Sequence, residues 1–179
     1  MAGSAAHEGA ASRGDRREET AADAADPAPA AVVERFLDRL RTDPEGAADF
    51  LAPDAKWMNN GLPAVRGRER VRKVFRALER IDTGFDVYVH TISVDGTSVM
   101  TERTDALKWG AMRVQFWVCG RFDVRDGEIV HWQDYFDYLT TFVATARGLL
   151  GIVLPTARPK PPSGDWHGGI TRPAGNGER

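Results

Sequence analysis

The stretch between Phe85 and Asp137 constrains the fold more than any other part of the chain, because apolar residues alternate with polar ones over four successive runs. Alternation with a period of two is typical of β-strands with one buried face. Asp95-Gly96 and Asp126-Gly127 stand between runs, and these dipeptides fit the tight turns of β-hairpins. The stretch therefore predicts an antiparallel meander. The runs are FDVYVHTISV (85–94), TSVMTERTDAL (97–107), AMRVQFWVCGRFDV (111–124) and EIVHWQDYFD (128–137).

Segments with helical periodicity flank the meander on both sides. Two segments before the meander place apolar residues at helical spacing, which gives each an apolar stripe along one side, and a third helical segment directly follows the meander. Asp43 is expected to cap a further short helix beginning with Pro44, and residues 55–60 form a brief extended piece. This order predicts an α+β fold, in which helices cover the concave face of a curved antiparallel sheet and leave a cavity. The three helical segments are 27–42, 68–81 and 138–150.

The length of 179 residues suits one domain with tails. Residues 1–26 contain almost nothing to bury, so this N-terminal tail is expected to be disordered. Residues 27–154 are expected to form the folded domain. Residues 155–179 are predicted to be an extension that Pro and Gly interrupt repeatedly.

Charge and composition exclude several classes of partner. The formal net charge is −2 and the charges are interspersed, unlike the basic surface of a nucleic-acid-binding protein. No segment approaches the roughly 20 apolar residues of a membrane span, and no signal peptide is evident, so we expect a cytoplasmic protein without a membrane partner. The only cysteine, Cys119, lies in an apolar strand, and the four histidines do not cluster, so no disulfide or metal site is predicted.

One acidic residue is predicted to lie on an apolar face. In the run 112–124 the even positions are apolar and the odd ones include Arg, Gln and Asp, so the even positions face inward. In the next run, Asp134 stands between Trp132 and Phe136 on the more apolar face. An aspartate in such surroundings needs a partner, because burying an unpaired charge is costly.

Arg103 and Asp105 share one face of another strand, although composition does not tell whether that face points inward. Two such charges are usually a solvated ion pair that contributes little to stability. A guanidinium on the inner face can instead hold a carboxylate on each side, here Asp105 and Asp134. Two carboxylates that share a guanidinium in an apolar cavity can differ in proton affinity, so that one is a base and the other an acid.

Three stretches of the chain carry a resemblance to a known family. They are WMNNGLP (57–63), TERTDAL (101–107) and GEIVHWQDYFD (127–137), and their order and content resemble the limonene-1,2-epoxide hydrolases. The resemblance covers roughly residues 31–150 and implies the NTF2-like or SnoaL-like cone, an α+β fold. It also implies an enzyme without a cofactor, which adds water to a small apolar epoxide in one step and forms a vicinal diol.

The resemblance assigns the three charged residues to catalytic roles. Asp134 matches the base that takes a proton from water, and Asp105 matches the acid that protonates the epoxide oxygen. Arg103 matches the arginine that orients both. An ionised carboxylate raises the nucleophilicity of water, while a neutral one stabilises the developing alkoxide.

The resemblance also implies that two further residues hold the attacking water. Asn59 matches the water-holding asparagine, although the neighbouring Asn60 remains an alternative. Trp57 stands where the family has a tyrosine, and its indole can donate a hydrogen bond but cannot accept one. Without the resemblance, both asparagines would be interpreted as part of a turn before Gly61.

The substrate-binding wall and the oligomeric state are less specific predictions. Homodimerisation is implied by the resemblance and is compatible with a strand face that carries Arg113, Gln115, Trp117 and Arg121, where Trp117 would otherwise be an exposed aromatic. The residues predicted to line the substrate pocket, for each of which core packing is the alternative, are Leu107, Phe116, Val118 and Phe136.

Two other functions fit the same residues. In the first, a hydroxyl group of a polyketide-like substrate attacks the epoxide, or the substrate is isomerised, so the enzyme is a cyclase or isomerase. In the second, the protein is a binding or dimerisation module without catalysis. The module is the better account if Trp57, Trp109 and the C-terminal segment fill the pocket.

Overall fold

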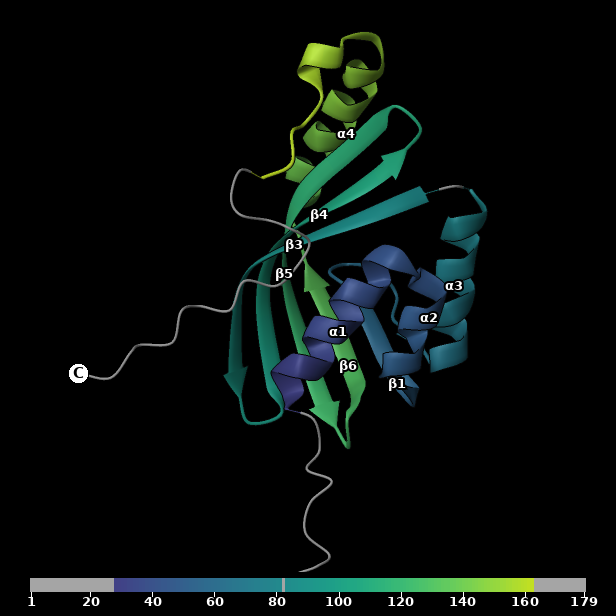
Figure 1. Cartoon of the computed structure of the whole chain (residues 1–179), viewed down its shortest axis with the longest axis vertical. Helices are drawn as coiled ribbons and strands as arrows, with labels where there is room; N and C mark the ends of the chain where they lie inside the picture. Colours follow the sequence, from purple (N-terminus) through teal and green to yellow (C-terminus); the bar gives the residue numbers. More distant parts are fainter. Residues whose placement is uncertain (1–27, 82, 163–179) are drawn as a thin grey trace, which may run out of the picture.

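The computed structural model describes residues 28–81 and 83–162 and has an α+β architecture, as predicted (Figure 1). The predicted disordered tail, residues 1–26, lies outside the described residues, as does most of the predicted extension. The elements in chain order are α1 (Pro29–Thr42), α2 (Pro44–Ala47), the 3₁₀ turn η1 (Ala48–Phe50), β1 (Leu51–Asn59), β2 (Val65–Arg66), α3 (Arg68–Arg80), β3 (Thr83–Asp95), β4 (Ser98–Trp109), β5 (Met112–Arg125), β6 (Glu128–Tyr135), α4 (Tyr138–Val153) and the 3₁₀ turn η2 (Pro155–Ala157).

The predicted meander is confirmed in β3 to β6, which pair with their chain neighbours in antiparallel fashion. Asp126 and Gly127 adopt φ angles of 49° and 73°, which suit a tight hairpin turn between β5 and β6.

The prediction of a wholly antiparallel sheet is wrong, because β1 pairs with β6 in parallel. The six strands lie in the order β2-β1-β6-β5-β4-β3, so the sheet is mixed. The predicted extended piece at 55–60 belongs to the longer strand β1, which lies beside a strand almost 80 residues later in the chain. Parallel strands are joined by a long connection and not by a short hairpin turn. The sequence therefore contains no local turn signal from which this pairing could be predicted. This pairing sets Asn59 opposite Asp134 and Trp57 opposite Trp132.

The helices α1 to α3 lie on one face of the sheet, and their apolar stripes form the core with it (Figure 1). Phe36 of α1 makes edge contacts with Phe122 of β5 and Trp132 of β6, at ring-centroid distances of 6.0 Å and 5.0 Å. The predicted cap is present, since the Asp43 carboxylate accepts a hydrogen bond from the Gly46 backbone N–H at 2.8 Å. No described helix is long and apolar enough to cross a bilayer.

The structure settles which strand faces point inward. The even positions of β5 are the inner ones, as predicted, with Val118 and Phe122 buried. In β4, where composition left the matter open, the odd positions face inward, so Arg103 and Asp105 are buried. The charged residues of β4 and of β6 therefore meet on one concave face.

Candidate active site

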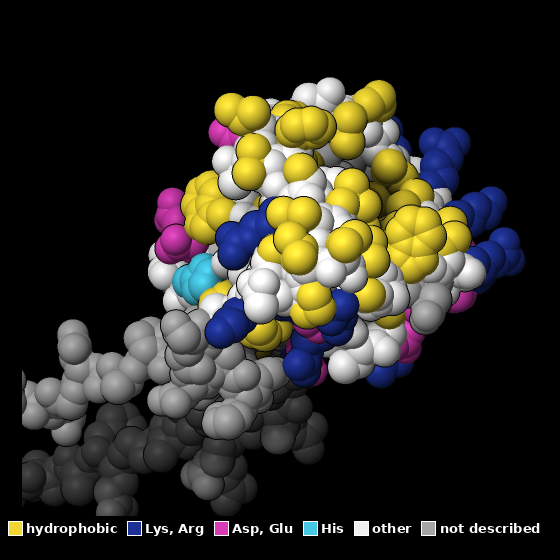
Figure 2. All heavy atoms as spheres, turned by 90° about the horizontal axis from the view of Figure 1, so that it is seen from above, with side chains coloured by type: hydrophobic (Ala, Val, Ile, Leu, Met, Phe, Trp, Pro, Cys, Tyr) yellow, Lys and Arg dark blue, Asp and Glu magenta, His cyan; other side chains and the backbone are white. Residues whose placement is uncertain are grey.

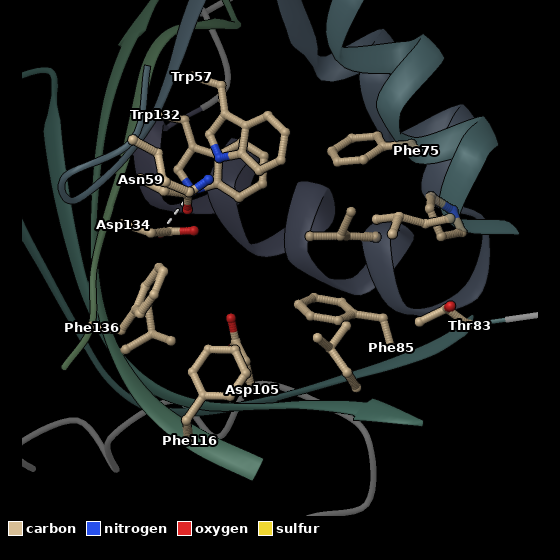
Figure 3. A pocket seen from close by; sticks show the side chains of 16 residues that line it. Trp57, Asn59, Phe75, Thr83, Phe85, Asp105, Phe116, Trp132, Asp134 and Phe136 are labelled. Carbon is tan, nitrogen blue, oxygen red and sulfur yellow. Dashed lines mark hydrogen bonds between the residues drawn. The ribbon is translucent and has the colours of Figure 1, made fainter. Parts of the chain in front are cut away.

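A cavity of about 210 Å³ opens between the concave face of the sheet and the helices α1 and α3 (Figure 3). Most of its walls are aromatic or aliphatic. The lining residues with polar side chains, apart from the tryptophans, are Asn59, Thr83, Asp105 and Asp134. Figure 3 shows the carboxylates of Asp105 and Asp134 pointing into the cavity from neighbouring parts of the sheet.

Arg103 lies behind this wall and bridges the two carboxylates. Its side chain is only 1% exposed. Nη2 lies 2.6 Å from Oδ1 of Asp134, and Nε donates to Oδ1 of Asp105 at 2.9 Å. Nη1 donates to the hydroxyl of Thr101 at 3.2 Å, and the guanidinium lies over the ring of Phe122. The predicted arrangement of Asp105, Arg103 and Asp134 is present in the structure.

The strand order explains how Arg103 reaches Asp134. Arg103 belongs to β4 and Asp134 to β6, and β5 lies between these strands. On β5 the residue opposite Asp134 is Gly120, which also pairs with Thr101 of β4. A Cβ atom on Gly120 would lie 2.1 Å from Nη1 of Arg103. The missing side chain thus makes room for the guanidinium to cross the middle strand.

The two oxygens of Asp134 have different surroundings. Oδ1 receives Nη2 of Arg103 and also the indole N–H of Trp132, which donates at 2.8 Å. Within the described residues, the ion pair and the hydrogen bond of this carboxylate both fall on Oδ1. Oδ2 is therefore the oxygen that remains for a ligand in the cavity. The Trp132 contact is a feature that the sequence did not predict.

The surroundings of Asp105 favour the protonated form of its carboxyl group. Burial raises the pKa of Asp105 to about 6, because the surroundings disfavour its charge; Arg103 lowers this pKa and the charge of Asp134 raises it. Burial opposes the charge of Arg103, but the two carboxylates outweigh that effect and raise the pKa of the guanidinium. The arginine therefore stays charged, while Asp105 has access to its neutral form.

Asn59 and Trp57 both line the cavity, as predicted. Asn59 stands next to Asp134 across the parallel strand pair, whereas Asn60 is exposed and absent from the cavity wall, so the structure favours Asn59 as the pocket amide. The ring of Trp57 stacks on Trp132 at a centroid distance of 4.8 Å. Its indole N–H is buried, and no described residue accepts a hydrogen bond from it.

The four residues predicted to contact substrate all lie on the apolar wall, with Phe116 and Phe136 in ring contact at 5.7 Å. Their contact with a substrate stays a prediction. Trp109 is 62% exposed and lies outside the cavity wall. The wall also contains residues that the sequence placed only on the apolar stripes of helices, or did not single out: Leu40, Leu62, Phe75, Leu78 and Phe85.

Metal ligands do not gather in the part of the chain that the structure describes. No group of three or more His, Cys, Asp or Glu residues is arranged there to hold a metal ion.

The sequence model of a protein family, the limonene-1,2-epoxide hydrolase catalytic domain, matches residues 27–147 of this chain. The chain belongs to the limonene-1,2-epoxide hydrolase family. Epoxide hydrolase EphG of Mycobacterium tuberculosis is 42% identical over 128 residues, which are 71% of this chain and 85% of that protein. The predicted family is therefore confirmed, and with it the predicted class of enzyme is supported.

Solved structures agree with this family assignment. One solved structure is that of an epoxide hydrolase from M. tuberculosis that resembles the limonene-1,2-epoxide hydrolases. It shares 41% sequence identity with this chain and has a TM-score of 0.67, and the match covers 71% of this chain and 96% of the other. An NTF2-like protein of Burkholderia pseudomallei is only 13% identical, with a TM-score of 0.58 over 65% of this chain and 96% of that one. The second likeness concerns the fold alone and confirms the predicted NTF2-like cone.

Gly120→Ala tests the tight fit around the guanidinium. The added Cβ would also lie 2.7 Å from the Thr101 hydroxyl, so Arg103 must move. We expect epoxide turnover to fall about 100-fold, because small misplacements of groups at a reacting centre lower the rate by that much. We also expect the free energy of unfolding to decrease by about 1–3 kcal/mol. Steady-state kinetics and urea unfolding measure both effects.

Gly84→Ala is the matched control. Gly84 also lies in a strand, but an added Cβ there would meet the flexible side chain of Lys108, which can move. Turnover should stay close to that of the unchanged protein. Unchanged turnover in Gly120→Ala would contradict the account of this site.

Proposed function

We propose that the protein is a cofactor-independent epoxide hydrolase, which adds water to a small apolar epoxide in one step and releases a vicinal diol. The observation that carries this proposal is the buried Arg103, which holds two carboxylates at the wall of one apolar cavity. Family membership and the similarity to an epoxide hydrolase from M. tuberculosis support the same reaction.

In this proposal Asp134 is the base and Asp105 is the acid. Oδ2 of Asp134 takes a proton from a water molecule, whose oxygen forms a bond to one epoxide carbon. The bond from that carbon to the ring oxygen breaks, and the ring oxygen receives the proton of Asp105. Proton exchange with solvent then returns Asp105 to its neutral form and Asp134 to its ionised form. Arg103 keeps its charge throughout and orients both groups.

The attacking water needs a defined set of hydrogen bonds. It donates one hydrogen to Oδ2 of Asp134 and the other to the amide oxygen of Asn59. The unpartnered indole N–H of Trp57 donates to one lone pair of the water oxygen, and the second lone pair attacks the epoxide. A donor is all that this position has to supply, so tryptophan can stand where the family has tyrosine.

The open cavity supports a catalytic role over the non-catalytic module. That alternative required Trp57, Trp109 and the C-terminal segment to fill the pocket. Trp57 instead lies flat against Trp132, and Trp109 is exposed and does not line the cavity. The C-terminal segment from residue 163 lies outside the described residues.

We also propose that the protein is a cytoplasmic homodimer. The outer sheet face predicted to form the contact carries Trp117, which is 49% exposed and donates a hydrogen bond to Glu102. An exposed aromatic side chain held in place in this way suits an interface.

Asp134→Asn and Asp105→Asn test the two proton transfers. Each change keeps the shape of the side chain but removes the base or the acid, so we expect kcat to fall about 10²–10⁴-fold. Styrene oxide or limonene oxide in ¹⁸O-labelled water is the assay, with the diol analysed by mass spectrometry. Product without solvent label would indicate the cyclase or isomerase instead.

Asp54→Asn is the control for this pair. Asp54 is exposed on β1, the strand that also carries Asn59, so its replacement should leave kcat unchanged. Full activity in either Asp134→Asn or Asp105→Asn would rule the mechanism out.

Trp57→Phe and Trp57→Tyr separate the indole N–H from the aromatic ring. Phenylalanine keeps a ring against Trp132 but removes the donor, so we expect kcat to fall about 10-fold, the cost of one hydrogen bond, with little change in KM. Tyrosine restores a donor and should recover much of the loss. Equal kcat values for the phenylalanine variant and the unchanged protein would contradict the assigned role.

The pH dependence tests the assignment of Asp105 as the acid. Its pKa is raised to about 6 by burial, so its active, protonated form prevails below that pH and is lost above it. We therefore expect kcat/KM to decline tenfold per pH unit on the alkaline side of about pH 6. A profile that stays flat from pH 5 to pH 8 would show that the free enzyme does not need this proton.

A further inference from the structure

The indole of Trp132 lies within a column of four stacked side chains. Its register partners on the neighbouring strands are Trp57 of β1 and Phe122 of β5. Both rings stack on it, Trp57 at a centroid distance of 4.8 Å and Phe122 at 6.1 Å, with interplanar angles of 15° and 13°. The guanidinium carbon of Arg103 lies over Phe122, 5.9 Å from the ring centroid. The column thus connects the charged centre of the site with the indole of Trp57.

The ring of Trp132 is held by further contacts with the helices. Phe36 of α1 meets its edge at a centroid distance of 5.0 Å, and Phe75 of α3 contacts it at 6.2 Å. Trp132 is 4% exposed and Phe122 is fully buried, in contrast to the hydrophobic side chains that lie at the surface around α4 (Figure 2). A close-packed ring cannot turn without displacing its neighbours. The core therefore sets the direction in which the indole N–H points.

The indole N–H of Trp132 holds one oxygen of Asp134. It donates to Oδ1 at 2.8 Å, and Nη2 of Arg103 lies 2.6 Å from the same oxygen (Figure 3). An oxygen with one donor can follow that donor while the carboxylate turns about the Cβ–Cγ bond, whereas donors from two residues restrict this rotation. Both oxygens of a carboxylate turn together. Fixing Oδ1 therefore also fixes the direction of Oδ2.

The same ring restricts Trp57. The indole of Trp57 packs against Trp132 and also against Phe75, at a centroid distance of 5.7 Å. Its buried N–H has no acceptor among the described residues. An unsatisfied buried donor is unfavourable, so a side chain that could turn would bring this N–H to an acceptor. The two ring contacts oppose such a turn and keep the N–H at the cavity wall.

We propose that Trp132 is a positioning residue for epoxide hydrolysis, which orients both the base and the indole that bind the attacking water. Its N–H fixes the carboxylate of Asp134, and its ring supports the ring of Trp57. Trp132 transfers no proton and forms no bond to the substrate, so it acts through these two neighbours. The inference rests on the proposed function, because it concerns the same water molecule.

Replacing Trp132 with benzothienylalanine tests the hydrogen bond. A sulfur atom takes the place of the indole N–H, so the ring keeps its shape and its stacking and loses only the donor. We expect kcat for diol formation from styrene oxide in ¹⁸O-labelled water to fall about 10-fold, the effect of one hydrogen bond, with little change in KM. The same replacement at Trp109, which is exposed and does not line the cavity, is the control and should leave kcat unchanged.

A second pair of variants tests the support of Trp57. Trp57→Phe removes the donor and should lower kcat about 10-fold in the benzothienylalanine variant, where the ring at position 132 remains. In Trp132→Leu the supporting ring is lost, so the Trp57 donor is already misplaced and Trp57→Phe should change kcat much less. Circular dichroism and urea unfolding check the fold of each variant. If Trp132→Leu does not fold, the benzothienylalanine variant alone decides.

The outcomes separate this inference from the proposed function. Labelled diol from the unchanged protein, together with an unchanged kcat in the benzothienylalanine variant, would overturn the role of Trp132 and leave the hydrolase intact. An equal effect of Trp57→Phe in both backgrounds would likewise overturn the support of Trp57. No labelled diol from the unchanged protein would overturn the proposed function, and with it the inference.

Discussion

The buried guanidinium of Arg103 is the interaction on which the rest of the site depends. A charge that is almost fully removed from water must be neutralised nearby, and removing a partner of such a pair is far more costly than breaking a surface ion pair. Asp105 and Asp134 supply that neutralisation from two different strands. The requirement explains why β5 carries a glycine between them, since any larger residue at position 120 would block the guanidinium.

One guanidinium with two carboxylates produces an asymmetric pair because the surroundings differ. Oδ1 of Asp134 is held by two donors, Nη2 of Arg103 and the indole N–H of Trp132. Asp105 is paired with Nε of Arg103 alone, and burial raises its pKa. The aromatic wall beside Asp105 contributes to this effect, since an apolar surrounding disfavours the charged form of a carboxyl group. The proposed division into base and acid follows from these contacts.

Alternation in the sequence predicted much of this arrangement. The inward faces of β5 and β6 follow from composition, and so does the need of Asp134 for a partner. The inward face of β4 does not, because both of its faces carry charged residues. The parallel pairing of β1 and the bond from Trp132 to Asp134 depend on contacts between distant segments, which no local pattern encodes. The choice of Asn59 over Asn60 likewise required the register of β1.

The central claim is that Asp134 acts on a water molecule and never bonds to the substrate. Its free oxygen faces the cavity beside Asn59, a position that suits a base but would also suit a nucleophile. A single turnover in ¹⁸O-labelled water, with enzyme in excess over epoxide, distinguishes the two. The account predicts that the first diol formed carries one full equivalent of the solvent label. Unlabelled diol in that first turnover would mean that its new oxygen came from a carboxylate, and would contradict the account.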